Sequence, residues 1–162
     1  MDEILATHDR TGKEAAQDLL LSSQLCFALH STTLALGRVY QKVLAPLGLT
    51  YTQYLVMLVL WERGRLSVKE LGEALALDSG TLTPLLKRLE QAGHVRRARD
   101  RRDERRVLVE PTPSGLALRE EAAGIPARIF AACNGSGVAL DRFKADLEAL
   151  RSALTTSGEE PA

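Results

Sequence analysis

Hydrophobic residues recur at helical spacing along most of the chain, which predicts a mainly helical fold. No proline interrupts the stretch from Asp18 to Leu44, and its apolar residues follow the helical period at Leu25, Leu29, Leu36, Val39 and Val43. The run YLVMLVLW is apolar on every side, as expected of a helix inside a core. A final helix is indicated by Phe143, Leu147, Leu150 and Leu154.

Helix-capping residues, prolines and glycines set the boundaries of the predicted elements. Thr50 with Gln53, and Ser67 with Glu70, fit capping boxes at two helix starts, and Asp78 or Ser79 caps a third helix. Pro84 falls inside this third helix and is expected to disturb its first turn. Further boundaries are expected after Leu44 at Pro46–Gly48, at Gly64, at Gly93, at Thr112–Pro113 and at Pro126.

The middle of the chain combines short helices with a β-hairpin. A helix from Ser67 to about Ala76 is followed by one whose Leu82, Leu85, Leu86 and Leu89 face the core. Val95–Arg99 and Arg106–Glu110 then read as strands around the tip Asp100–Arg105. Helix, turn, helix and hairpin in this order predict a winged helix-turn-helix: a mainly α fold with a small β-hairpin wing.

The domain organisation follows from these elements. We expect one domain over residues 17–154, with the winged helix at about 50–110 and flanking helices at about 17–45 and 113–154. Residues 1–16 and 155–162 read as mobile tails. A single subunit would leave the apolar stripes of the flanking helices in water. A two-fold homodimer formed by these helices is the commonest way to bury them.

The distribution of charge along the chain indicates a binding partner. The whole chain is neutral, with 21 Lys and Arg against 21 Asp and Glu, but Pro84–Arg106 holds 9 basic and 4 acidic residues, a net charge of +5. This concentration favours binding to the phosphate backbone of double-stranded DNA over a merely solvated surface hairpin. No apolar run is long enough to span a membrane, and the polar N-terminus does not resemble a signal peptide. We therefore expect a cytoplasmic protein with no membrane partner.

Candidate DNA contacts lie on the second helix of the pair and on the hairpin. The hydroxyls of Ser79, Thr81 and Thr83 are short enough to approach bases or phosphates, and Arg88 suits a bidentate guanine contact. Further candidates are Lys87, Arg97 and Arg99, and Asp103 is expected to orient a neighbouring arginine, which leaves Arg105 to enter a narrow A/T-rich minor groove. Idle surface arginines and a weak surface ion pair are the alternatives. A dimer would read an inverted repeat with half-sites about one helical turn apart.

Two cysteines, Cys26 and Cys133, are the candidates for chemistry. In a reducing compartment they are expected to be free, and each is either an inert core residue or a reactive thiol. Cys26 and His30 could meet a metal, but two ligands are too few for a closed site, so we expect no metal and no cofactor. A thiol peroxidase is disfavoured because the chain has neither a thioredoxin-like pattern nor Cys-x-x-Cys. We therefore expect that the protein is not an enzyme.

Three segments narrow the interpretation: QLCFALHSTT (24–33), LTYTQYLVMLVLWE (49–62) and LDSGTLTPLLKRLEQAG (77–93). With the DERRV wing, they resemble the organic hydroperoxide resistance regulators (OhrR) within the MarR-type winged-helix repressors. The resemblance implies a homodimeric repressor in which Cys26 senses organic hydroperoxides, Tyr40 and Tyr51 bond this cysteine, and Cys133 resolves it. The family usually has a tyrosine where this chain has His30.

The residues and the resemblance together give the leading hypothesis of a redox-switched repressor. Its alternative is a MarR-type repressor released by a non-covalent small-molecule ligand, with incidental cysteines. Tyr40 follows Cys26 by 14 residues on one predicted helix, which places the two about 21 Å apart along the axis. A bond between them is therefore expected across the dimer, whereas His30 lies within reach of Cys26 in the same copy.

Overall fold

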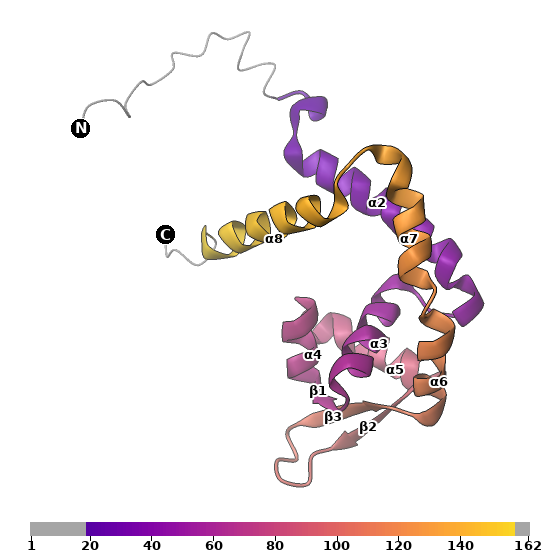
Figure 1. Ribbon diagram of the computed structural model, residues 1–162. Helices are drawn as coiled ribbons and strands as arrows, with labels where there is room; N and C mark the ends of the chain where they lie inside the picture. The colour runs from indigo at the N-terminus through magenta and orange to yellow at the C-terminus, as the bar shows by residue number, and fades with distance from the viewer. Residues whose placement is uncertain (1–18, 158–162) are drawn as a thin grey trace.

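The computed structural model describes residues 19–157, which form a helical protein with one small sheet (Figure 1). The predicted tail at 1–16 lies outside these residues. The elements are η1 (Leu21–Ser23), α2 (Leu25–Leu44), η2 (Ala45–Leu47), α3 (Tyr51–Arg63), β1 (Leu66–Ser67), α4 (Val68–Leu75), α5 (Ser79–Gln91), β2 (Val95–Arg99), β3 (Val107–Pro111), α6 (Pro113–Ala122), α7 (Ile125–Cys133), η3 (Asn134–Ser136) and α8 (Leu140–Ser157). The fold class is the expected winged helix-turn-helix.

Both ends of the described chain differ from the prediction. The first long helix begins at Leu25 rather than at Asp18, because Gln24 has an extended backbone and the residues before it form only the 3-10 turn η1. The serines of this turn favour local backbone bonds over helix continuation. At the other end α8 continues to Ser157, so the expected tail from residue 155 begins too early.

Capping side chains fix the helices of the winged-helix centre. The two predicted capping boxes are present: the Gln53 backbone N–H donates to the Thr50 hydroxyl at 3.4 Å, and the Glu70 N–H to the Ser67 hydroxyl at 3.2 Å. Asp78 caps α5 by accepting from the Thr81 N–H at 2.8 Å. The predicted disturbance at Pro84 was wrong, since α5 runs as a regular helix from Ser79 to Gln91.

The wing is a three-stranded antiparallel sheet in the order β1-β3-β2. Val109, at the centre of β3, is fully buried and pairs with Leu66 on one side and Arg97 on the other. The sequence predicted the β2–β3 hairpin but missed β1, because two residues are too short to show an alternating pattern. The hairpin joins the helices through Thr112, whose hydroxyl accepts from the Gly115 N–H at the start of α6.

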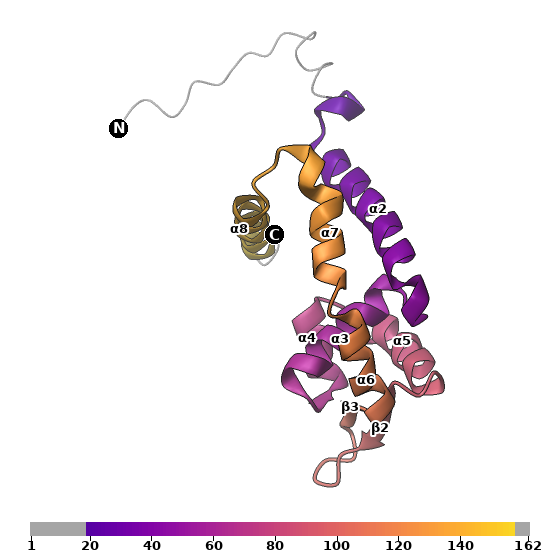
Figure 2. The same cartoon turned by 45° about the vertical axis from the view of Figure 1, so that its right-hand side comes forward.

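The core lies between the helix pair α4–α5, the sheet and α3. Its fully buried side chains include Met57, Leu60, Leu71, Leu86 and Val109. Two elements extend away from this centre: α7 lies beside α2, and α8 projects to one side (Figure 2). The helix that begins at Pro113 is interrupted after Ala122, and α7 starts at Ile125 with Pro126 in its first turn, as predicted.

Within residues 19–157, no single helix is both long and apolar enough to span a membrane. Residues Leu25–Leu47 and Tyr51–Arg63 pass that test only when taken together, across a bend of 67°.

Candidate DNA-binding face and cysteine sites

Helix α5 presents three candidate hydroxyls, and two of them already donate a hydrogen bond. The Thr81 hydroxyl donates to the Asp78 carboxylate at 2.8 Å, and the Thr83 hydroxyl donates to the Ser79 carbonyl at 2.7 Å. Both oxygens can still accept a bond, but their protons are engaged. The Ser79 hydroxyl is exposed and has no partner among the described residues, so it is the one of the three free to donate to a phosphate.

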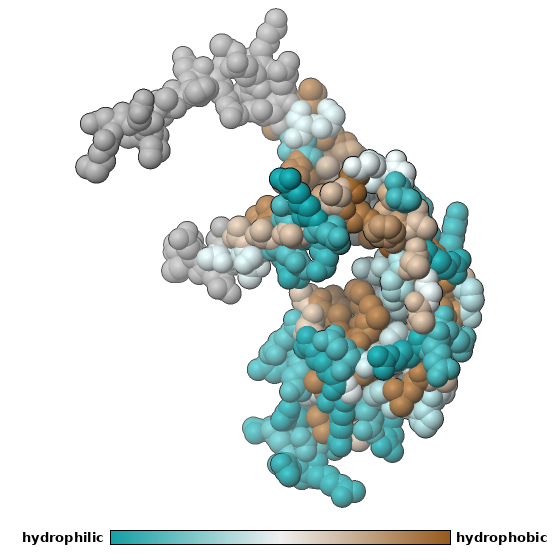
Figure 3. Space-filling model, in the orientation of Figure 1, coloured by the Kyte–Doolittle hydropathy of each residue, from teal (hydrophilic) through white to brown (hydrophobic). Residues whose placement is uncertain are grey.

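The charged residues of α5 are available to a ligand. Lys87 and Arg88 are both exposed, and neither has a partner in the described part of the chain. A groove of about 960 Å³ lies between α4, α5 and the wing, with Ser79, Thr83 and Arg105 in its lining. Its surroundings at the lower end of the molecule are strongly hydrophilic (Figure 3).

The wing holds its arginines in two different ways. At the tip, Arg105 itself, rather than a neighbouring arginine, donates its Nε–H to the Asp103 carboxylate at 3.1 Å, and it stays almost fully exposed. Arg99 is also exposed. Arg97 differs, because it is half-buried and donates two side-chain hydrogen bonds to Glu90, at 2.9 and 2.7 Å. The expected phosphate contact by Arg97 therefore competes with an internal partner.

Sequence reasoning missed the acidic residues that hold this face together. Arg96 on β2 donates its Nε–H to Glu110 on β3 at 2.8 Å, and Arg106 lies 3.5 Å from the Glu70 carboxylate. Each pair joins residues that are far apart in the sequence. Only knowledge of how the elements pack, such as the register of the two strands, could have indicated which residues meet. Arg96 and Glu110 are in fact cross-strand partners.

Cys26 and its neighbour in sequence, His30, lie at the start of α2. Both residues are exposed, and the Cys26 thiol is free. Leu25 and Phe27 on the same turn are exposed as well, at 62% and 39%. No described residue donates a hydrogen bond to the Cys26 thiol within the single chain. The tyrosines that the family resemblance assigns to it therefore do not bond it within one chain.

Those tyrosines gather near the opposite end of α2. The ring centroids of Tyr40 and Tyr51 lie 4.4 Å apart, and Tyr54, which the sequence did not single out, lies 6.1 Å from Tyr40. Burial raises the pKa of Tyr40 to about 12, with further contributions from Tyr51, Tyr54 and the half-buried thiol of Cys133. Burial also raises the pKa of Tyr54. The phenols of Tyr40 and Tyr54 thus stay protonated at neutral pH and can donate O–H bonds.

The two cysteines are free and lie on different helices, Cys26 near the start of α2 and Cys133 at the end of α7. Cys133, at the end of α7, lies within electrostatic range of Tyr40, whereas Cys26 precedes Tyr40 by 14 residues on the uninterrupted α2. That separation corresponds to about 21 Å along the helix axis.

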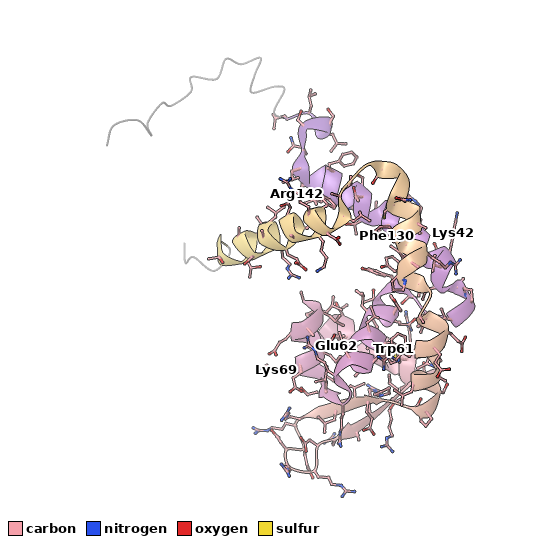
Figure 4. All side chains as sticks on the ribbon, in the orientation of Figure 1. Lys42, Trp61, Glu62, Lys69, Phe130 and Arg142 are labelled. Carbon is pink, nitrogen blue, oxygen red and sulfur yellow. The ribbon has the colours of Figure 1, made fainter. Side chains whose placement is uncertain are left out.

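Helices α2 and α8 leave apolar side chains in water. The stripe predicted on α8 is present, with Phe143 42% and Leu154 62% exposed. Phe130 on α7, labelled in Figure 4 together with Arg142 on α8, is 58% exposed. A hollow beneath α8 is floored by hydrophobic surface over α3 and α4 (Figure 3). These surfaces have no cover within the described chain.

A second, smaller cavity of about 500 Å³ opens between α3, α6 and α7. Its lining includes Tyr54, Leu58, Trp61 and Arg119 (Trp61 is labelled in Figure 4). The Trp61 Nε–H donates to the Gly115 carbonyl at 2.8 Å, and Arg119 has no partner among the described residues. In residues 19–157, no three His, Cys, Asp or Glu side chains are grouped closely enough to hold a metal ion.

Comparison with known proteins places this architecture in a family. Residues 38–121 match the family model of the SarA/Rot transcriptional regulators. The transcriptional regulator TtmR of Methylorubrum extorquens is 51% identical over 88% of this chain and 71% of its own length. The organic hydroperoxide resistance transcriptional regulator of Bacillus subtilis is 46% identical, over 84% and 88% of the two chains.

A solved structure supports the same placement. AbfR of Staphylococcus epidermidis, in its reduced form bound to DNA, superposes with a TM-score of 0.73 at 35% identity, covering 86% of this chain and 96% of AbfR. The winged helix-turn-helix fold and these similarities agree. The chain belongs to the MarR/SarA-type winged-helix transcriptional regulators, DNA-binding proteins that include the OhrR-type repressor of B. subtilis.

Proposed function

We propose that the chain is a homodimeric repressor that leaves DNA when an organic hydroperoxide oxidises Cys26. The observation that carries the proposal is the split arrangement along α2. An exposed, unpartnered thiol lies at the start of α2, and three tyrosines gather near its other end, where Tyr40 is within electrostatic range of the second thiol, Cys133. The similarity to the hydroperoxide resistance regulator of B. subtilis supports the same inducer class.

The chemistry needs only the two thiols and the peroxide. The Cys26 thiolate attacks the outer oxygen of ROOH, the O–O bond breaks, and the alkoxide leaves and takes a proton to become ROH. The sulfur is thereby oxidised to a sulfenic acid. The Cys133 thiol then attacks this sulfur, forming a disulfide and releasing water. Phenol donors such as Tyr40 and Tyr51 favour the reaction by stabilising the thiolate, and His30 is a further candidate for this tuning.

The partner subunit supplies the missing half of each site. An antiparallel crossing of two α2 helices would bring Cys26 of one copy to the tyrosine cluster of the other. The same assembly would cover the apolar side chains of α8 and the exposed leucines before α2, which is the burial that a stable dimer requires. Oxidation would then act directly on the interface that sets the distance between the α5 helices of the two subunits, the helices that we expect to read the DNA.

DNA recognition is assigned to α5 and the wing tip. We expect Arg88 to read a guanine edge, and Arg105, held by Asp103, to enter an A/T-rich minor groove. We expect Lys87, Arg99 and Ser79 to meet phosphates, and Thr81 and Thr83 to accept from DNA donors. Two subunits would bind an inverted repeat. Because its partner is chromosomal DNA, we expect the protein to act in the cytoplasm.

A non-reducing gel with peptide mapping tests the redox step. Protein treated with one equivalent of cumene hydroperoxide should run as a covalent dimer, with Cys26 linked to Cys133. Neither Cys26→Ser nor Cys133→Ser should form this species. A covalent dimer that persists in Cys133→Ser, or oxidised protein that stays monomeric with a free Cys133 thiol, would contradict the two-cysteine mechanism.

A ligand-released repressor is the second candidate, and the cavity at Trp61 favours it. An aromatic ring could lie beside Trp61 and Leu58 while a carboxylate meets the unpaired Arg119. The two candidates differ in their need for thiols. A variant lacking both cysteines would still release DNA on addition of a small aromatic carboxylate if the ligand mechanism operates, and would ignore cumene hydroperoxide.

A further inference from the structure

Glu90 is an acidic residue inside the most basic part of the chain. It lies near the end of the recognition helix α5, and its carboxylate accepts three hydrogen bonds from Arg97 on β2. Two come from the guanidinium, at 2.9 and 2.7 Å, and both reach Oε2. The third comes from the Arg97 backbone N–H, which donates to Oε1 at 3.0 Å.

The backbone bond gives this pair a mechanical role. In the sheet order β1-β3-β2, strand β2 is an edge strand, and its other edge has no strand to pair with in the described chain. Glu90 takes up a donor on that edge and so fastens β2 to α5. Because β2 continues directly into the wing tip, this attachment controls how the tip lies relative to the recognition helix.

The pairing of Glu90 with Arg97 also lowers the positive charge that the DNA face offers to a ligand. Arg97 is only 27% exposed in its side chain, and its charge is matched by that of Glu90. Hydrogen bonding from Arg97 lowers the pKa of the Glu90 carboxyl, which therefore stays ionised at neutral pH. Arg97 is thus engaged internally, and the free cations of this face are residues such as Lys87, Arg88 and Arg99.

We propose that Glu90 is a positioning residue of the DNA interface, which locks the wing to the recognition helix through Arg97 and is required for tight sequence-specific binding. This inference rests on the proposed DNA-binding face, and it reassigns Arg97 from a phosphate contact to the partner of that lock. It predicts that an acidic residue strengthens binding to a polyanion.

Simple electrostatics predicts the opposite sign, which makes the inference testable. Removing one negative charge next to the DNA face should increase the affinity for every duplex. Loss of the wing's orientation should instead weaken binding to the preferred duplex and reduce its advantage over a scrambled one. Glu104 provides a matched control, since it lies on the same wing, is exposed and has no partner in the described chain.

The experiment uses the full-length reduced protein and a duplex that the wild type selects from a randomised library. Fluorescence anisotropy gives the affinity for this duplex and for its scrambled version. Glu90→Ala should bind the selected duplex about tenfold more weakly, with a smaller ratio of selected to scrambled affinity. Glu104→Ala should bind as tightly as the wild type or more tightly. Thermal melting monitors the folding of each variant.

A charge-swapped double variant, Glu90→Arg with Arg97→Glu, separates positioning from general damage. It keeps the net charge and the side-chain pair but loses the backbone bond, because a guanidinium at position 90 cannot accept from the N–H of residue 97, so its affinity should lie between those of Glu90→Ala and the wild type. The inference is overturned if Glu90→Ala binds the selected duplex as tightly as the wild type, or if the swap is folded and restores nothing. A wild type that selects no duplex over scrambled DNA would refute the proposed function instead.

Discussion

The strongest test of the subunit arrangement is a mixed dimer that separates Tyr40 from Cys26. In the single chain both residues lie on α2, which runs without a break from Leu25 to Leu44. The rise of an α-helix sets them about 21 Å apart, far beyond the reach of a tyrosine side chain. If Tyr40 bonds the Cys26 thiolate, it must do so across the dimer.

The expected size of the effect follows from the hydrogen bond. Tyr40 has a pKa raised to about 12, chiefly by burial, so its phenol keeps the proton that it would donate. Losing one such donor should destabilise the partner thiolate by about 1.4 kcal/mol and slow its oxidation up to about tenfold near neutral pH. The Tyr40→Phe homodimer should therefore react about tenfold more slowly than the wild type.

Mixed dimers, purified through two different tags, place this defect in one subunit. In the first, one subunit carries Cys26→Ser and the other Tyr40→Phe, so the remaining Cys26 faces an intact Tyr40 across the interface. It should react with cumene hydroperoxide at the wild-type rate per thiol. In the second, one subunit carries both changes and the other is wild type. The Cys26 of the wild-type subunit then faces the Tyr40→Phe subunit and should react slowly. The reverse order of these two rates would refute contact across the interface.

Three further predictions concern the framework and the DNA face. Gly115→Ala should lower the unfolding free energy by about 3 kcal/mol, because the added Cβ would collide with the His94 carbonyl oxygen. Gly124→Ala, where the Cβ meets nothing within 4 Å, is the control, and chemical denaturation measures both. Arg88→Ala should weaken DNA binding by about 1–3 kcal/mol and should relax the sequence preference at one base pair only. If binding assays show the same loss of affinity for all DNA sequences, the base contact is refuted. Hydrogen bonding from Arg97 lowers the pKa of Glu90 from its ordinary value of 4.5. The Glu90–Arg97 pair therefore stabilises the fold fully above pH 4.5, and this stabilisation is lost as the pH falls through the lowered pKa. The difference in unfolding free energy between wild type and Glu90→Gln should thus shrink below pH 4.5, and a constant difference would contradict this assignment.

Local signals in the sequence predicted most of the fold correctly. The capping boxes at Thr50 and Ser67 give the starts of α3 and α4, and Pro126 separates α6 from α7. Errors occurred where no local signal exists. The start of α2 was placed too early because the apolar spacing continues through the residues before Leu25, and β1 is too short for any pattern.

The candidate sites were less accessible to sequence reasoning, since they depend on contacts between distant elements. Arg97 looks like any other basic residue of the wing until Glu90 is found beside it on α5. Tyr54 joins the tyrosine cluster only through the packing of α3 against α2. In contrast, the distance between Cys26 and Tyr40 followed from sequence alone, because a continuous helix converts residue separation into length.

The measurement that tests the central claim most directly is a titration of the DNA complex with cumene hydroperoxide. Wild-type protein bound to its selected duplex should be released fully by about one equivalent of peroxide per subunit, and a thiol reductant should restore binding. Cys26→Ser should bind the duplex with the wild-type affinity and remain bound throughout the titration. Release of Cys26→Ser at the same peroxide concentration, or a wild type that stays on the DNA while Cys26 is oxidised, would contradict the account.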